Sequence, residues 1–152
     1  MIHFCPWCAY LTIRFNPDSD IPQLYSMDII VDLLQDRKLH IEPTAVGYFG
    51  GISHRRANMF PEGTGDFNLD YDSYRRILDG IDGLQVVDIP RYCCRVADWA
   101  IWQYAQERGL DNIVTPCPSC YGRLMRRAPE GMRVLHMAQF LLTVVDPKRT
   151  CS

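Results

Sequence analysis

The chain has 152 residues, with 16 Lys and Arg against 18 Asp and Glu and a net charge of −2, so one domain with a single core is the simplest expectation. The apolar share is ordinary for a globular protein, and the balanced charge gives no reason to expect nucleic acid or an anionic membrane as a partner. No apolar run approaches the ~20 residues of a transmembrane segment.

The first residues carry neither the basic start nor the apolar stretch of a secretory signal peptide, so we expect a cytoplasmic chain. Seven cysteines in that compartment favour metal or redox chemistry over a disulfide scaffold. Because seven is odd, we interpret Cys151, in the polar tail, as the spare.

Hydrophobic periodicity and turn residues predict alternating strands and helices along the chain. In the first half these are a strand at 2–4, a helix at 22–36 with Asp20 as its N-cap, a strand at 45–49 and a loop at 59–68. In the second half they are a helix at 70–78, a strand at 85–89, a helix at 96–105, a strand at 112–115, a short helix, a strand at 133–135 and a last helix through 140–144. This alternation predicts an α/β domain with a mostly parallel sheet flanked by helices.

Two cysteine pairs follow strands of the predicted sheet. Cys93 and Cys94 come after the strand at 85–89, and Cys117 and Cys120 come directly after the strand at 112–115. Because the carboxyl ends of parallel strands meet at one edge, we expect a four-sulfur site there. The simpler alternative is a set of buried cysteines that act as small apolar side chains.

The sequence leaves the metal open, since ligation by thiolates alone suits zinc and iron–sulfur clusters equally well. Adjacent strand residues point to opposite faces, so Cys93 and Cys94 must lie in a turn or bridge two metals, and bridging favours a cluster.

An internal repeat links the two ends of the chain. Cys5-Pro6-Trp7-Cys8 and the helix that follows at Leu24–Ile30 match Cys117-Pro118-Ser119-Cys120 and the helix that follows at Leu135–Leu141. We therefore divide the chain into the tail of a first unit, residues 1–44, and a second unit, residues 45–152, packed together.

The Cys93-Cys94 pair, the stretch Ile113-Val114-Thr115-Pro116-Cys117-Pro118-Ser119-Cys120 and the helix after Leu135 resemble the cysteine-rich CCG domain family. That family includes the B subunit of heterodisulfide reductase. The chain departs from it at Tyr48-Phe49-Gly50-Gly51, where the family has a leading cysteine, and at Arg95, where it has glycine. The interval between Cys94 and Cys117 is also short for the family, and Cys5 and Cys8 lack a double-cysteine partner.

The resemblance implies an oxidoreductase subunit that transfers electrons to or from a thiol or disulfide, with an iron–sulfur cluster on Cys93, Cys94, Cys117 and Cys120. The alternative is a zinc-binding structural or protein-interaction module without catalysis. The expected partners are other subunits of a redox complex or a second copy of the chain.

Several other residues carry two interpretations each. Cys5 and Cys8 are either the remnant of a decayed site or a ligand pair completed by another chain, with a thioredoxin-like dithiol as a third reading. His54 is either a replacement ligand or a surface residue, and His136 is a packing or capping residue. Arg55, Arg56, Arg91 and Arg95 form a solvated face, suit an anionic thiol substrate or offset thiolate charge. Trp99 and Trp102 are predicted to share an exposed patch.

Overall fold

The computed structural model describes residues 1–4, 24–51 and 71–146, together with residues 8, 12, 15, 16, 18 and 20–22. For residues 71–73 it describes the backbone alone. Cys5, His54, Arg55, Arg56, Cys151 and the predicted loop at 59–68 lie outside the described residues.

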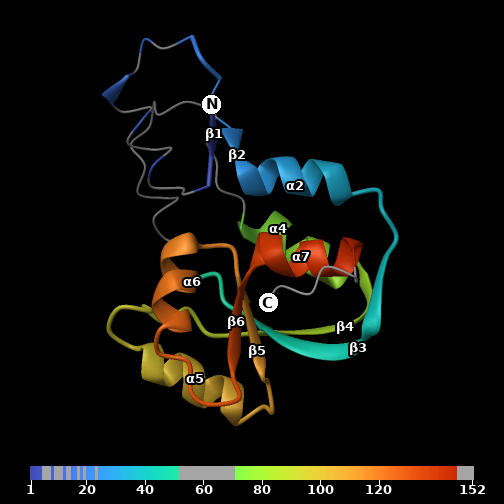
Figure 1. Ribbon diagram of the computed structural model, residues 1–152, viewed down its shortest axis with the longest axis vertical. Coiled ribbons are helices and arrows are strands. Elements are labelled where there is room, and N and C mark those ends of the chain that lie inside the picture. The colour runs from blue at the N-terminus through green and yellow to red at the C-terminus, as the bar shows by residue number, and fades with distance from the viewer. Residues whose placement is uncertain are drawn as a thin grey trace.

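The strands form two parallel sheets, which confirms the predicted α/β class with a mostly parallel sheet (Figure 1). β1 (Ile2–His3) and β2 (Leu24–Tyr25) make a small pair. The larger sheet has the order β4-β3-β5-β6 and consists of β3 (Leu39–Tyr48), β4 (Ile81–Asp88), β5 (Asn112–Thr115) and β6 (Arg133–His136).

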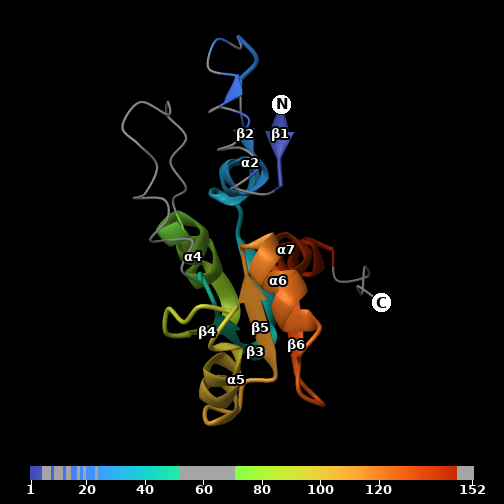
Figure 2. The same ribbon diagram turned by 90° about the vertical axis from the view of Figure 1, so that its left-hand side faces the viewer.

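Helices cover both faces of the larger sheet (Figures 1 and 2). They are α2 (Ser26–Leu34), α4 (Tyr71–Asp79), α5 (Asp98–Gln106), α6 (Pro118–Met125) and α7 (Met137–Val145). One core cluster joins α2, α4 and α7 to the strand face that carries Val46 and Val114. The other joins α5 and α6 to the opposite face, which carries Ile113 and Val134, because successive strand residues point to opposite sides.

Most predicted elements of the second half agree with the structure, and the strand at 112–115 matches β5 residue for residue. The helix predicted at 96–105 instead begins at Asp98, because Cys93 to Ala97 form a turn in which the Val96 and Ala97 amides donate to the Cys93 carbonyl. The strand predicted at 85–89 is β4, which begins four residues earlier at Ile81, where it pairs with Leu39.

Two predictions in the first half were wrong in their boundaries. The helix at 22–36 begins at Ser26, because Leu24 and Tyr25 are extended and pair with Ile2 and His3, so Asp20 is not its N-cap. The strand at 45–49 is the end of β3, which begins at Leu39 and crosses the predicted unit boundary between residues 44 and 45. Its register with β4 shifts between His40 and Thr44, around Pro43, which has no amide hydrogen for the ladder.

The carbonyl of Pro116, at the end of β5, connects the small strand pair to the larger sheet. The buried Tyr25 hydroxyl donates to it at 3.0 Å, and His136 Nε2 lies 3.1 Å from it. His136 Nδ1 accepts from the Ala138 amide and caps α7, so the ring is neutral and its Nε2 carries the proton that is donated to Pro116. This confirms His136 as a capping residue.

Among the described helices, none combines the length and the apolar character that a membrane crossing needs.

The first prediction concerns the cap at His136. Burial lowers the pKa of this histidine below its usual value of about 6.5, so the folded state binds its proton less readily than the unfolded state. The contribution of neutral His136 to stability is therefore complete above pH ~6.5, and it is lost as the pH falls from there through the lower pKa of the folded state. We expect urea unfolding at pH 5 to show a loss of about 1 kcal/mol relative to pH 7.5, the typical cost of losing an N-cap.

The control is His136→Asn, which keeps a capping side chain but does not titrate. This variant should be less stable at pH 7.5, because the donor to Pro116 is gone, and its stability should change less between the two pH values. An equal pH dependence in both proteins would contradict the assignment.

Candidate thiol centre

Three buried thiols meet at the carboxyl edge of the larger sheet. Cys94 lies in the turn after β4, Cys117 is the N-cap of α6, and Cys120 lies in the first turn of that helix. All three belong to the core cluster beneath α5 and α6, and none of them is in a disulfide. The predicted convergence of the two strand ends is therefore present for these three residues.

The Sγ atoms of Cys94 and Cys120 are 3.4 Å apart, within hydrogen-bonding distance. The Cys120 thiol stabilises a thiolate at Cys94 and, together with the Arg123 guanidinium, lowers the pKa of Cys94 to about 7, although burial and the Cys117 charge oppose this shift. The pKa of Cys120 is raised instead, first by its hydrogen bond with Cys117, then by that with Cys94, and by burial. The shifts therefore favour ionisation at Cys94 and protonation at Cys120.

The backbone around Cys117 is held from several directions. Cys117 is extended, its amide donates to Thr115 Oγ1 at 3.3 Å, and its carbonyl accepts from the Tyr121 amide. Pro118 begins α6, where its missing amide hydrogen costs nothing. With the Pro116 carbonyl fixed by Tyr25 and His136, the position of the Cys117 backbone is determined by the surrounding fold.

Gly51 closes the third side of the centre. It follows β3, the strand between β4 and β5, and has a left-handed φ of 66°. A Cβ at this position would lie 3.0 Å from Cys120 Sγ. The strand end where the family resemblance places a leading cysteine therefore does reach the thiols, but it presents glycine there.

The other predicted site residues lie apart from this cluster or outside the described chain. Cys93 is half-buried in the turn, and the structure gives its sulfur no hydrogen-bond contact with another described sulfur. Cys8 is exposed. Because Cys93 and Cys94 lie in a turn, the first of the two predicted geometries for the adjacent pair is the one present.

The structure adds a cation that the sequence prediction missed. Arg123 acts on Cys94, whereas the arginines singled out from the sequence were those near the double cysteine and after β3. The missed signal was its position three residues after Cys120, which places both on one side of α6.

The predicted tryptophan patch is wrong for Trp102. Trp99 is 66% exposed, but Trp102 is buried in the same cluster as the cysteines. The Trp102 indole nitrogen has no hydrogen-bond partner in the described part of the chain, so the cluster contains a buried donor without an acceptor.

The donor chemistry of this cluster fits a thiolate-ligated metal, because the ligand atoms that its described residues bring together are cysteine sulfurs and the Arg123 guanidinium offsets negative charge at Cys94. The arrangement is not a complete metal cage, since no three His, Cys, Asp or Glu side chains within the described residues are placed to hold a metal ion. Two sulfurs on a tetrahedral zinc lie about 3.8 Å apart, given Zn–S bonds of about 2.3 Å. The 3.4 Å separation of Cys94 and Cys120 needs only a small widening to reach it.

A shallow hollow of about 260 Å³ adjoins the double-cysteine turn. Tyr92, Trp99 and Tyr104 form its aromatic walls, and Glu107 adds a carboxylate. The Arg108 guanidinium stacks on Tyr104, 3.5 Å from the ring centre. Tyr92, which lines this hollow, directly precedes Cys93 in the chain, and most of the other lining residues belong to α5.

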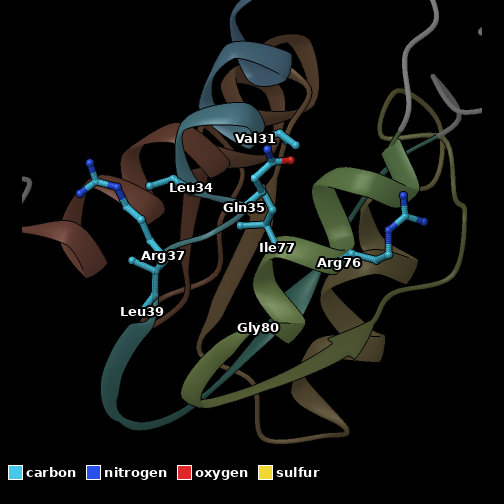
Figure 3. A pocket seen from close by; sticks show the side chains of 8 residues that line it. All are labelled: Val31, Leu34, Gln35, Arg37, Leu39, Arg76, Ile77 and Gly80. Carbon is cyan, nitrogen blue, oxygen red and sulfur yellow. The ribbon is translucent and has the colours of Figure 1, made fainter.

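A second hollow, of about 290 Å³, lies at the other end of the sheet (Figure 3). Leu34, Leu39 and Ile77 contribute to its apolar lining, and Figure 3 shows the Arg37 and Arg76 side chains on opposite sides of it. It lies where β3 and β4 begin, whereas the thiols lie where β4 and β5 end. It is therefore separate from the thiol centre.

In comparisons with known proteins, the chain matches no family model and no curated protein.

The second prediction tests the contact between Gly51 and Cys120. Gly51→Ala and Gly109→Ala both place alanine at a left-handed φ, of 66° and 64°, and each should lose about 1–2 kcal/mol of stability for that reason. A Cβ at Gly109 meets no atom within 4 Å, so the two variants differ in their contact with Cys120. We expect Gly51→Ala alone to change the alkylation rates of Cys94 and Cys120, measured by mass spectrometry on the metal-free chain. Equal alkylation rates in the two variants would refute the contact.

Proposed function

We propose that this chain is a redox subunit that holds an iron–sulfur centre and transfers electrons to or from a thiol or disulfide, as the resemblance to heterodisulfide reductase subunits implies. The observation that carries the proposal is the meeting of three buried thiols, from two crossover connections, at one edge of a parallel sheet. In a cytoplasmic setting, such a group of free thiols favours metal or redox chemistry over disulfide scaffolding. Cytoplasmic location is part of the proposal.

The proposed ligands are Cys94, Cys117 and Cys120, with Cys93 from the same turn as the fourth. An iron–sulfur centre would supply one-electron chemistry at this edge of the sheet. Among the chain's own residues, Arg123 would prepare the site, because its guanidinium offsets thiolate charge. The fixed Pro116 carbonyl keeps Cys117 in place for ligation.

The alternative proposal is a zinc-binding structural or protein-interaction module without catalysis. Two observations favour it: the thiols join the loops after β4 and β5, which a structural zinc would lock together, and Trp99 and the hollow walled by Tyr92 offer a contact surface beside them. The two proposals share their ligands and differ in the metal.

The third prediction separates these alternatives by composition. Anaerobically purified protein should contain iron and acid-labile sulfide and should absorb broadly in the visible range. Cys94→Ser and Cys117→Ser should each lower metal content sharply and destabilise the fold, because ligand binding and folding are coupled at such sites. Cys151→Ser is the control and should change neither.

A colourless protein that contains zinc would reject the iron–sulfur proposal in favour of the structural module. A protein that contains neither metal, with all seven thiols titrating, would reject both. Equal effects of Cys151→Ser and Cys117→Ser would show that the ligands are assigned wrongly.

We also propose that the chain associates, either with other subunits of a redox complex or with a second copy of itself. The small strand pair and α2 expose large apolar side chains, which include Ile2, Leu24 and Leu33, the last at 64%. Apolar surface of this kind on neighbouring elements is often covered by a partner.

The fourth prediction tests this association by light scattering on the purified chain at micromolar concentrations. We expect a species larger than the monomer, and Leu33→Lys should shift it toward the monomer because a charge would then have to be buried at the contact. The control is Val145→Lys, at an exposed apolar position at the end of α7. A monomer that recruits no partner subunit would exclude the association.

A further inference from the structure

We propose that in the metal-free chain Cys94 and Cys120 form a redox pair that a hydroperoxide converts into a disulfide. The proposal goes beyond metal binding, because the reaction needs only the two sulfurs and the oxidant. It rests on the geometry of the reduced centre. The two Sγ atoms are 3.4 Å apart, both residues are buried, and both are free thiols.

The distance that remains to be closed is small. A disulfide bond is about 2.05 Å long, so the two sulfurs must approach by roughly 1.4 Å. Cys94 lies in a turn between β4 and α5, outside regular secondary structure, where a local adjustment does not break a strand or helix. Cys120 lies in the first turn of α6, with no side chain at Gly51 to obstruct its sulfur.

The two other cysteines of the centre are less suitable partners. Cys93 is next to Cys94, but its sulfur makes no hydrogen-bond contact with another sulfur of the described chain. Cys117 does interact with Cys120, but its backbone is fixed by the bond to Thr115 and by the two bonds on the preceding carbonyl. Any backbone adjustment for a Cys117–Cys120 bond would act on this held segment, whereas adjustment for the Cys94–Cys120 bond can take place in the turn that carries Cys94.

The reaction is a two-electron oxidation in two steps. The sulfur of Cys94, the more exposed of the pair, attacks one oxygen of hydrogen peroxide, and the O–O bond breaks. Cys94 becomes a sulfenic acid, and the released hydroxide takes up the thiol proton to form water. The sulfur of Cys120 then attacks the sulfenic sulfur, its proton leaves with the hydroxyl as a second water, and the S–S bond forms. Two thiols are oxidised, and one peroxide is reduced to two waters.

Formation of this bond would also affect metal binding, and this point rests on the proposed function. The disulfide would remove two of the proposed thiolate ligands at once. Metal loading and disulfide formation would then be mutually exclusive states of one site, and the cellular supply of peroxide and reductant would select between them.

The sequence offers a direct assay for the bond. Trypsin cleaves after Arg91, Arg95, Arg108 and Arg123, so Cys93 and Cys94 leave in one peptide, Tyr92–Arg95, and Cys117 and Cys120 in another, Gly109–Arg123. The metal-free, fully reduced chain is treated with hydrogen peroxide, its remaining thiols are alkylated under denaturing conditions, and the digest is analysed by mass spectrometry. The expected product is the two peptides joined by a reducible bond.

Single substitutions identify the two sulfurs. Cys94→Ser and Cys120→Ser should each abolish the joined peptides, whereas Cys93→Ser and Cys117→Ser should retain them. Circular dichroism on each reduced variant shows whether it is folded. The same peroxide assay on the unsubstituted chain gives a readout that does not depend on any variant folding.

Three results would overturn the proposal. They are a bond confined to the peptide Gly109–Arg123, loss of the joined peptides in Cys93→Ser but not in Cys94→Ser, and conversion of the thiols to sulfinic acids without any bond. Iron or zinc uptake by the reduced chain is measured separately, so failure of the proposed metal site and failure of the redox pair give different outcomes.

Discussion

The position of β3 at the centre of a parallel sheet determines where the thiols lie. It pairs with β4 on one side and with β5 on the other, so the loops after all three strands leave the same edge next to one another. Cys94 comes from one outer loop, Cys117 and Cys120 come from the other, and Gly51 comes from the central loop between them. β4 and β5 are therefore two strand spacings apart, at about 4.8 Å for each spacing, and the two cysteine loops meet across the end of β3.

The close grouping of three thiols has an electrostatic cost that the surroundings meet only in part. Hydrogen bonds with Cys117 and Cys94 raise the pKa of Cys120, and burial and the neighbouring thiolate charges raise it further, whereas the hydrogen bond with Cys120 lowers the pKa of Cys94. The Arg123 charge favours the thiolate of Cys94. The reduced centre therefore combines one sulfur that ionises readily, Cys94, with one that stays protonated, Cys120.

The sequence predicted the fold class and the order of strands and helices because each buried strand is a short apolar run and each helix has a clear apolar stripe. It misplaced the start of α2, where Leu24 and Tyr25 continue the helical spacing but are drawn into a pair with Ile2 and His3. It also misjudged Trp102, which lies off the apolar stripe of α5 but is buried in the same cluster as the cysteines. The convergence of Cys94 with Cys117 and Cys120 was predictable from topology, whereas the separations of their sulfurs and the role of Arg123 depend on rotamers, which a pattern does not specify.

The shared carbonyl of Pro116 connects two parts of the chain that are distant in sequence. Tyr25 and His136 are each the last residue of the second strand of a parallel pair and directly precede a helix, and both reach the same oxygen. Docking of the small β1–β2 pair and α2 is thereby coupled to the backbone that carries Cys117. Such coupling is reciprocal in free energy: whatever stabilises the docked position of α2 also favours this geometry of the Cys117 segment, and a ligand that prefers this geometry holds α2 in place to the same extent.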